Sequence, residues 1–244
     1  MAERKAMFIP LEKLKEYALA FGVELDNTAL ERFDTYGRLL AEWNGKINLT
    51  AITDPDGITL KHFADSLSLL RYCEIPQGAS LIDVGTGAGF PGLALLIARP
   101  DIRLTLLDST KKKLTVIEDI LNNIGLEAVL LHSRAEEAGQ NKQYREKFDF
   151  ATARAVANLR ELAEYCLPFV KPGGSFISMK AAKAEEELAG AKKAIAALGG
   201  KTESKHKFEL FEAGERNIII IKKLSPTNGK YPRPSAKIAK NPLE

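Results

Sequence analysis

The chain has 244 residues, of which 45% are hydrophobic and 27% are charged, and its formal net charge is +3. This length suits one sizeable α/β domain with an appendage, and no apolar run reaches the roughly 18 residues that a transmembrane helix needs. The two cysteines and three histidines are too widely spaced for a disulfide framework or a zinc cluster, so we expect no metal. The charged residues 1–7 lack the apolar core of a secretory signal, so we expect a cytoplasmic protein.

The first 75 residues carry the apolar spacing of three helices. The first is predicted over Pro10–Phe21. Either Asp26 or Asn27 can cap the second, and residues 28–31 have the form of a capping box. The third starts at Asp54–Pro55, because proline suits the first helical position. We expect these helices to pack on the main domain as an N-terminal cap.

From residue 80 onward, short apolar strands alternate with helices, which implies a parallel sheet covered on both faces. The last two strands are separated by a short turn over residues 212–216, which predicts an antiparallel hairpin at one edge. The expected strands are Ser80–Val84, Arg103–Leu107, Ala128–His132, Phe148–Ala153, Ser175–Met179, His206–Phe211 and Asn217–Lys222. The expected helices are Pro91–Ala98, Lys111–Asn123, Leu159–Val170 and Ala184–Ala197.

The C-terminal residues are basic and rich in proline. Residues 222–244 contain six lysines and arginines against one acid, Glu244, and four prolines that predict an irregular segment. Such a tail can contact phosphates, or it can be a solvated end that keeps the protein soluble. We divide the chain into a helical extension (1–75), a main domain (76–224) and this tail (225–244).

A glycine turn, "LIDVGTGAGFPG", follows the first predicted strand. Its second half fits the dinucleotide pattern G-x-G-x-x-G, whereas Asp83 followed by Gly85, Gly87 and Gly89 is typical of an S-adenosylmethionine site. Glycines let backbone N–H groups approach a ligand at little conformational cost. Ligands of parallel sheets bind at the carboxyl ends of the strands, where this turn lies.

An acid at the end of the second strand, Asp108, can accept hydrogen bonds from a ribose, which both NAD and S-adenosylmethionine carry. Asp83 favours the second cofactor, because its carboxylate would repel a pyrophosphate and attract an ammonium or sulfonium group. The chain also has no Tyr-x-x-x-Lys pair, which many dehydrogenases use.

Several segments resemble the bacterial small-subunit rRNA methyltransferase G family, also called glucose-inhibited division protein B. They are "LAEWNGKINLTAIT", "KHFADSL", "VGTGAGFPGLALLIARP", "LLDSTKKK", "SRAEE", "ATARAVANL", "FISMKA" and "YPRPSAKIAKNPL". The resemblance implies a Rossmann-like, class I S-adenosylmethionine-dependent methyltransferase: an α/β fold whose seven-stranded, mostly parallel sheet has an antiparallel hairpin. It also implies methylation of guanine N7 in a loop of 16S rRNA.

The resemblance assigns roles by position. It implies that Gly85 and Phe90 contact the cofactor, that Ala135 and Glu136 flank the adenine, and that Asp108 holds the ribose. With Asp83, Gly87, Gly89 and Arg154 they form the expected cofactor site. Arg154 is expected at the mouth where methyl and base meet, and Lys180 beside an RNA phosphate or the base.

Guanine N7 carries a lone pair and no proton, so in-line attack on the methyl needs positioning to about 3 Å and no general base. We therefore expect Arg154 and Lys180 to orient RNA. The expected partner is 16S rRNA within the small ribosomal subunit or its precursor, bound by a monomer. A basic surface would hold phosphates and a pocket would hold an exposed guanine.

Other interpretations remain open at this point. The chain could methylate a small molecule or a protein, or it could be an RNA-binding or assembly protein without catalysis. Cys166, in a helical pattern, is not placed as a nucleophile for cytosine methylation. His62 is interpreted as a structural histidine, and residues 111–113 as a solvated helix face. Asp65 could hydrogen-bond locally or face the cleft.

Overall fold

The structure, a computed structural model, describes residues 7–154, 156–181 and 184–243. The charged residues 1–6, for which no signal was expected, Ala155 of the "ATARAVANL" segment and Glu244 of the tail lie outside the described residues. A seven-stranded sheet in the order β3-β2-β1-β4-β5-β7-β6 forms the centre of the molecule. Its strands are β1 (Ser80–Val84), β2 (Arg103–Asp108), β3 (Val129–His132), β4 (Phe148–Arg154), β5 (Val170–Lys180), β6 (Gly200–Glu209) and β7 (Glu215–Lys223).

Strands β1 to β5 pair in parallel, and β7 runs antiparallel to both β5 and β6. The predicted α/β fold with a terminal hairpin is therefore confirmed. The apolar run of β7 shows why the sheet is covered on both sides: Ile218 and Ile220 enter one hydrophobic core, and Ile219 and Ile221 enter the other. Successive side chains of a strand point to opposite faces, so an unbroken apolar run marks a strand that is buried on both.

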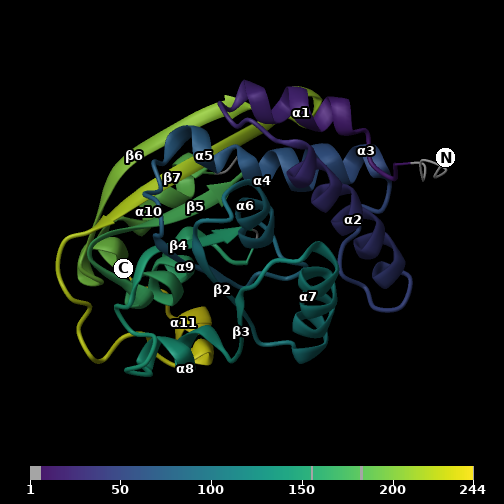
Figure 1. Ribbon diagram of the computed structural model, residues 1–244. Helices are drawn as coiled ribbons and strands as arrows, with labels where there is room; N and C mark the ends of the chain where they lie inside the picture. The colour runs from purple at the N-terminus through teal and green to yellow at the C-terminus, as the bar shows by residue number, and fades with distance from the viewer. Residues whose placement is uncertain (1–6, 155, 182–183, 244) are drawn as a thin grey trace, which may run out of the picture.

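Helices lie on both faces of the sheet (Figure 1). Two core clusters divide them: α6 and α7 share one with α1 and α2, whereas α9 and α10 belong to the other. Among the described residues, none of the helices combines the length and apolarity of a membrane span. Their bounds are α1 (Leu11–Ala20), α2 (Asn27–Asn44), α6 (Gly92–Ala98), α7 (Lys111–Ile124), α8 (Ala135–Gln140), α9 (Leu159–Cys166), α10 (Ala184–Ala197) and α11 (Ser235–Lys240).

The N-terminal helices contain one correction and one local irregularity. Asp26 caps α2, its Oδ1 accepting from the Ala29 N–H at 2.7 Å, so the capping box predicted over 28–31 is wrong: Thr28 lies inside the helix. The third predicted helix is a run of α3 (Pro55–Gly57), the π-helix η1 (Ile58–Ala64), α4 (Asp65–Leu67) and α5 (Leu69–Tyr72). Such π-helical turns are rare and occur often at functional sites.

Three boundaries differ from the sequence prediction by four residues or more. Helix α9 ends at Cys166, because Pro168 lies in a 3₁₀ turn, η2 (Leu167–Phe169), that follows it, and β5 starts directly after this turn. Strand β6 begins at Gly200 instead of His206; its sequence, GKTESKHKFE, is polar because it lies at the edge of the sheet. Helix α8 was not predicted, since its six residues lack an apolar period.

The C-terminal tail is held against the main domain by two arginines. Residues 225–234 are irregular, as predicted, whereas the short helix α11 was not predicted. Arg145 donates to the carbonyls of Gly139, Tyr231, Thr227 and Asn228. Arg233 pairs with the fully buried Glu164 through its Nε at 2.8 Å and its Nη2 at 2.7 Å. Helix α11, between these anchors and the C-terminus, buries Ile238.

We expect Glu164→Ala to lower the free energy of unfolding by about 3 kcal/mol, because it leaves the Arg233 guanidinium without its buried carboxylate. Urea denaturation of this variant, Arg233→Ala and the double variant gives the coupling energy of the pair. Glu137→Ala, on the exposed side of α8, is the control and should change stability by less than about 0.5 kcal/mol. A coupling energy near zero would show that the tail is held elsewhere.

Candidate active site

The glycine turn after β1 depends on backbone conformations that only glycine adopts easily. Gly85, Gly87 and Gly89 have φ angles of +74°, +62° and +102°. A Cβ at Gly85 would lie 2.8 Å from Cγ2 of Val156, and one at Gly89 would lie 2.7 Å from the Tyr36 hydroxyl. The turn therefore approaches two neighbouring segments too closely for any side chain.

Asp83 supports this turn from behind. The side chain is fully buried, and its Oδ2 accepts from the Thr86 hydroxyl at 2.7 Å and from the Gly92 N–H at 2.9 Å. Burial raises the pKa of this carboxyl to about 6. Its Oδ1 has no hydrogen-bond partner within the described residues. Asp83 thus joins β1 to the start of α6, and its contact with a cofactor stays a prediction.

A cavity of about 590 Å³ opens at the carboxyl ends of β1, β2 and β4. We call it the first cavity. Asp83 and Gly89, both predicted to touch a cofactor, are absent from its described lining. The other predicted cofactor residues do line it: Gly85, Gly87, Phe90, Asp108, Ala135, Glu136 and Arg154.

Asp108, the last residue of β2, places its carboxylate in the lining of the first cavity. Its Oδ2 accepts from the Gly87 N–H at 3.0 Å, and its Oδ1 accepts from the Thr110 N–H at 2.8 Å. Lys113 Nζ lies 3.7 Å from Oδ2. Residues 111–113 were expected to be a solvated helix face; Lys111 and Lys112 are exposed, but Lys113 lines the cavity, which corrects that expectation.

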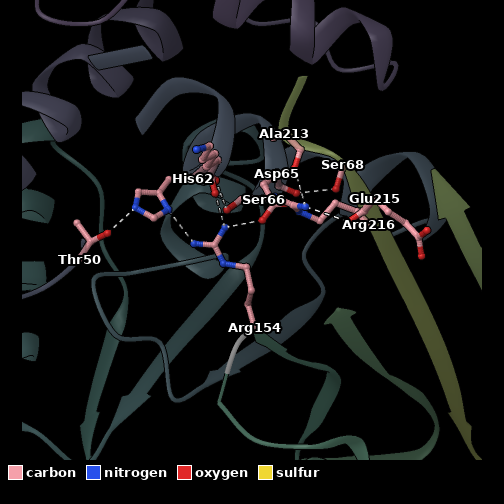
Figure 2. A network of polar contacts seen from close by, with 10 residues as sticks. Thr50, His62, Asp65, Ser66, Ser68, Arg154, Ala213, Glu215 and Arg216 are labelled. Carbon is pink, nitrogen blue, oxygen red and sulfur yellow. Dashed lines mark hydrogen bonds and ion pairs between the residues drawn. The ribbon is translucent and has the colours of Figure 1, made fainter. Parts of the chain in front are cut away.

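Arg154 lies at the end of β4 and contacts the π-helical segment of the N-terminal extension (Figure 2). Its Nη1 donates to the Lys61 carbonyl at 3.2 Å and to Asp65 Oδ2 at 2.9 Å, and its Nη2 lies 3.3 Å from His62 Nδ1. The other oxygen of Asp65 accepts from Arg216 Nε at 3.0 Å. The position of Asp65, left open by the sequence, is between two arginines.

His62 is a neutral ring with one assignable tautomer. Burial and the Arg154 charge lower its pKa to about 3. Because Arg154 can only donate, His62 Nδ1 accepts, so Nε2 carries the proton and donates to Thr50 Oγ1 at 2.8 Å. The ring also stacks on Phe90 with a centroid separation of 4.6 Å, and the Arg154 guanidinium carbon lies 5.0 Å from the same phenyl ring.

A second cavity, of about 480 Å³, lies on the other side of Arg154. His62 and Arg154 line both cavities. Lys180 lines the second cavity and not the first; its Nζ lies 2.8 Å from Glu187 Oε2 and also donates to the Ala157 carbonyl. The predicted pair of Arg154 and Lys180 thus spans two adjoining spaces.

Sequence reasoning missed Arg216, Glu187 and the role of Thr50. Arg216 enters from β7 and Glu187 from the first turn of α10, and neither stands in a recognisable motif. Thr50 does lie within "NLTAIT", one of the segments that carried the resemblance, and this position was the one available signal.

Solved structures with the same fold include methyltransferases. A putative methyltransferase in complex with the Haloferax volcanii activator Trm112 has a TM-score of 0.54 and 13% identity, and the match covers 78% of this chain and 98% of that one. A 16S rRNA adenine N1-methyltransferase from Catenulisporales acidiphilia has a TM-score of 0.51 and 15% identity, covering 62% of this chain and 88% of that one. At such identities the likeness shows the fold alone.

Sequence relatives are much more similar. A protein named ribosomal RNA small subunit methyltransferase G from an Exiguobacterium species is 50% identical over 226 residues, 92% of this chain and 95% of that protein. The protein of that name from Brevibacillus brevis is 46% identical over 234 residues, 95% of this chain and 98% of its own length. The family model described as rRNA small subunit methyltransferase G matches residues 29–219. The chain therefore belongs to the rRNA small subunit methyltransferase G family.

Proposed function

We propose that the protein transfers the methyl group of S-adenosylmethionine to N7 of a guanine in a loop of 16S rRNA, within the small ribosomal subunit or its precursor. Family membership carries this proposal: the relatives that bear the rRNA methyltransferase name are 46–50% identical over nearly the whole chain. We further propose that the protein acts as a monomer in the cytoplasm.

The first cavity fits the nucleoside part of S-adenosylmethionine. Asp108 already accepts two backbone N–H groups, and a carboxylate has about four acceptor sites, so two remain for ribose hydroxyls. Ala135 and Glu136, at the start of α8, would flank the adenine. The volume of about 590 Å³ lies within the range of small-molecule pockets.

When bound, S-adenosylmethionine supplies an electrophilic methyl group on a positively charged sulfur. The residues around the first cavity support attack by N7 without a general base. His62 is the one imidazole that lines it in the described structure, and its Nδ1 lone pair already accepts from Arg154. Cys166 is fully buried away from both cavities, and burial raises the pKa of its thiol well above the ordinary value.

Arg154 is suited to a positioning role. Three acceptors, the Lys61 carbonyl, Asp65 and His62, fix its guanidinium from the N-terminal side, and Phe90 lies beneath it. A cation held this firmly can orient an acceptor without moving during the reaction. Arg154 also adds positive charge beside the point where the reacting base would lie.

Incubating the protein with labelled S-adenosylmethionine and small-subunit particles that lack the modification should place the label on N7 of one guanine. Mapping the modified nucleotide by primer extension after chemical cleavage at 7-methylguanine checks this result. Label on an exocyclic amine or a ribose would contradict the proposed chemistry, and no transfer to rRNA would favour a small-molecule or protein substrate.

Gly85→Ala should raise the Kd for S-adenosylmethionine at least tenfold. The new methyl group would meet Val156, and the positive φ costs an alanine about 1–3 kcal/mol, so the turn or Val156 must shift, and both line the first cavity. Isothermal titration measures the Kd. Gly78→Ala is a matched control, because Gly78 has a φ of +71° with open space around its Cα and lies away from the cavity; it should leave the Kd within twofold.

The rate of methyl transfer in a single turnover should change less than twofold between pH 7 and pH 9. His62, with a pKa lowered to about 3, stays neutral throughout, and Asp83, with a pKa of about 6, stays largely ionised. Rapid-quench measurement at saturating cofactor tests this. A rate that rises tenfold per pH unit within this range would reveal a general base and rule out the proposed mechanism.

A further inference from the structure

We propose that the second cavity receives the acceptor guanine, and that Lys180 and Glu187 recognise its Watson–Crick edge. This inference rests on the proposed function and adds the residues that select the base.

The position of the second cavity suits an acceptor base. Methyl transfer requires that donor and acceptor meet in line at one point. The two cavities adjoin at His62 and Arg154, which line both. If the cofactor occupies the first cavity, a base in the second would reach the methyl group past these two side chains.

The lining of the second cavity also suits a purine base. Its walls include the apolar side chains of Ile52, Met179, Phe208 and Ile218. A purine that is flipped out of the RNA loses its stacking on neighbouring bases. Apolar and aromatic walls replace that stacking on its two faces. Polar side chains, among them Lys180, Glu187 and Asn217, line the same cavity and could hydrogen-bond to the edge of a base.

Lys180 and Glu187 form an ion pair in the lining of this cavity. The Lys180 side chain is 8% exposed and that of Glu187 is 25% exposed. Both contacts described for Glu187, with Lys180 Nζ at 2.8 Å and with the Leu159 N–H at 2.7 Å, fall on Oε2. Oε1 is therefore available as an acceptor, beside an ammonium group that carries three N–H donors.

A donor next to an acceptor matches guanine and mismatches adenine. Guanine presents the O6 acceptor beside the N1–H and N2–H donors, whereas adenine presents an N6 amine beside an unprotonated N1. Lys180 would donate to O6, and Glu187 would accept from N1–H and N2–H. With adenine the ammonium would face an amine and the carboxylate would face a lone pair, both repulsive.

The order of strands agrees with this orientation. Arg154, at the end of β4, is paired in register with Met179, which directly precedes Lys180 on β5. Moving from β4 to β5 therefore leads from the junction of the cavities to the ion pair. Around a guanine the order is N7, O6, N1 and N2, so N7 would face the first cavity while the Watson–Crick edge faces Lys180 and Glu187.

The test uses Glu187→Gln, which keeps the shape of the side chain and removes its charge. We expect kcat/KM on small-subunit particles to fall at least tenfold, with the Kd for S-adenosylmethionine unchanged within twofold. Glu186→Gln, in the same turn of α10 but exposed, is the matched control and should retain full activity.

A substituted base separates recognition from a structural effect. Particles reconstituted with inosine at the mapped guanine keep N7, O6 and N1–H but lack the N2 amine. We expect the wild-type protein to prefer guanosine over inosine at least fivefold, and Glu187→Gln to lose most of that preference. An equal preference in both proteins, or none in the wild type, would overturn the inference while leaving the proposed function intact. If the wild type methylates no rRNA, that result contradicts the proposed function, and the inference about the base pocket is contradicted with it.

Discussion

The contact of Arg154 with the π-helical segment is the interaction on which the rest of the site depends. It joins the carboxyl end of β4 to the N-terminal extension through Lys61, His62 and Asp65. Asp65 also holds Arg216 from β7, so three parts of the chain meet at one carboxylate. Since Arg154 and His62 line both cavities, the same contact lies where the two cavities adjoin. The N-terminal helices are therefore part of the site as well as a cover for the sheet.

Much of this arrangement could be predicted from the sequence, because it follows from local chemistry. Apolar strands such as Ser80–Val84 were placed from their pattern, and Asp108 was placed by the rule that strand ends in a parallel sheet form the ligand site. The turn residue Gly85 was singled out from the spacing of the glycines, and it does line the first cavity. In each case the physical requirement lies within a few consecutive residues.

The remainder depends on contacts between distant segments. Asp83 is predicted to contact a cofactor because it precedes the glycines, but its complete burial behind the turn is visible only in three dimensions. Glu187 and Arg216 stand in ordinary polar surroundings in the sequence, and only the packing of α10 and β7 brings them to the second cavity. The packing of the tail could not be predicted for a related reason: nothing in the sequence links Arg233 to its buried partner, Glu164.

The packing of the tail has a consequence for folding during synthesis. Gln140, the last residue of α8, donates to the carbonyls of Gly229 and Pro232. Arg145 donates to the Tyr231 carbonyl in the same stretch. Helix α8 begins with Ala135 and Glu136, which line the first cavity. Chains are synthesised from the N-terminus and fold as they emerge. Gly229 and Pro232 follow Gln140 by 89 and 92 positions, so a nascent chain that has emerged only as far as α8 lacks the contacts that hold this helix beside the first cavity.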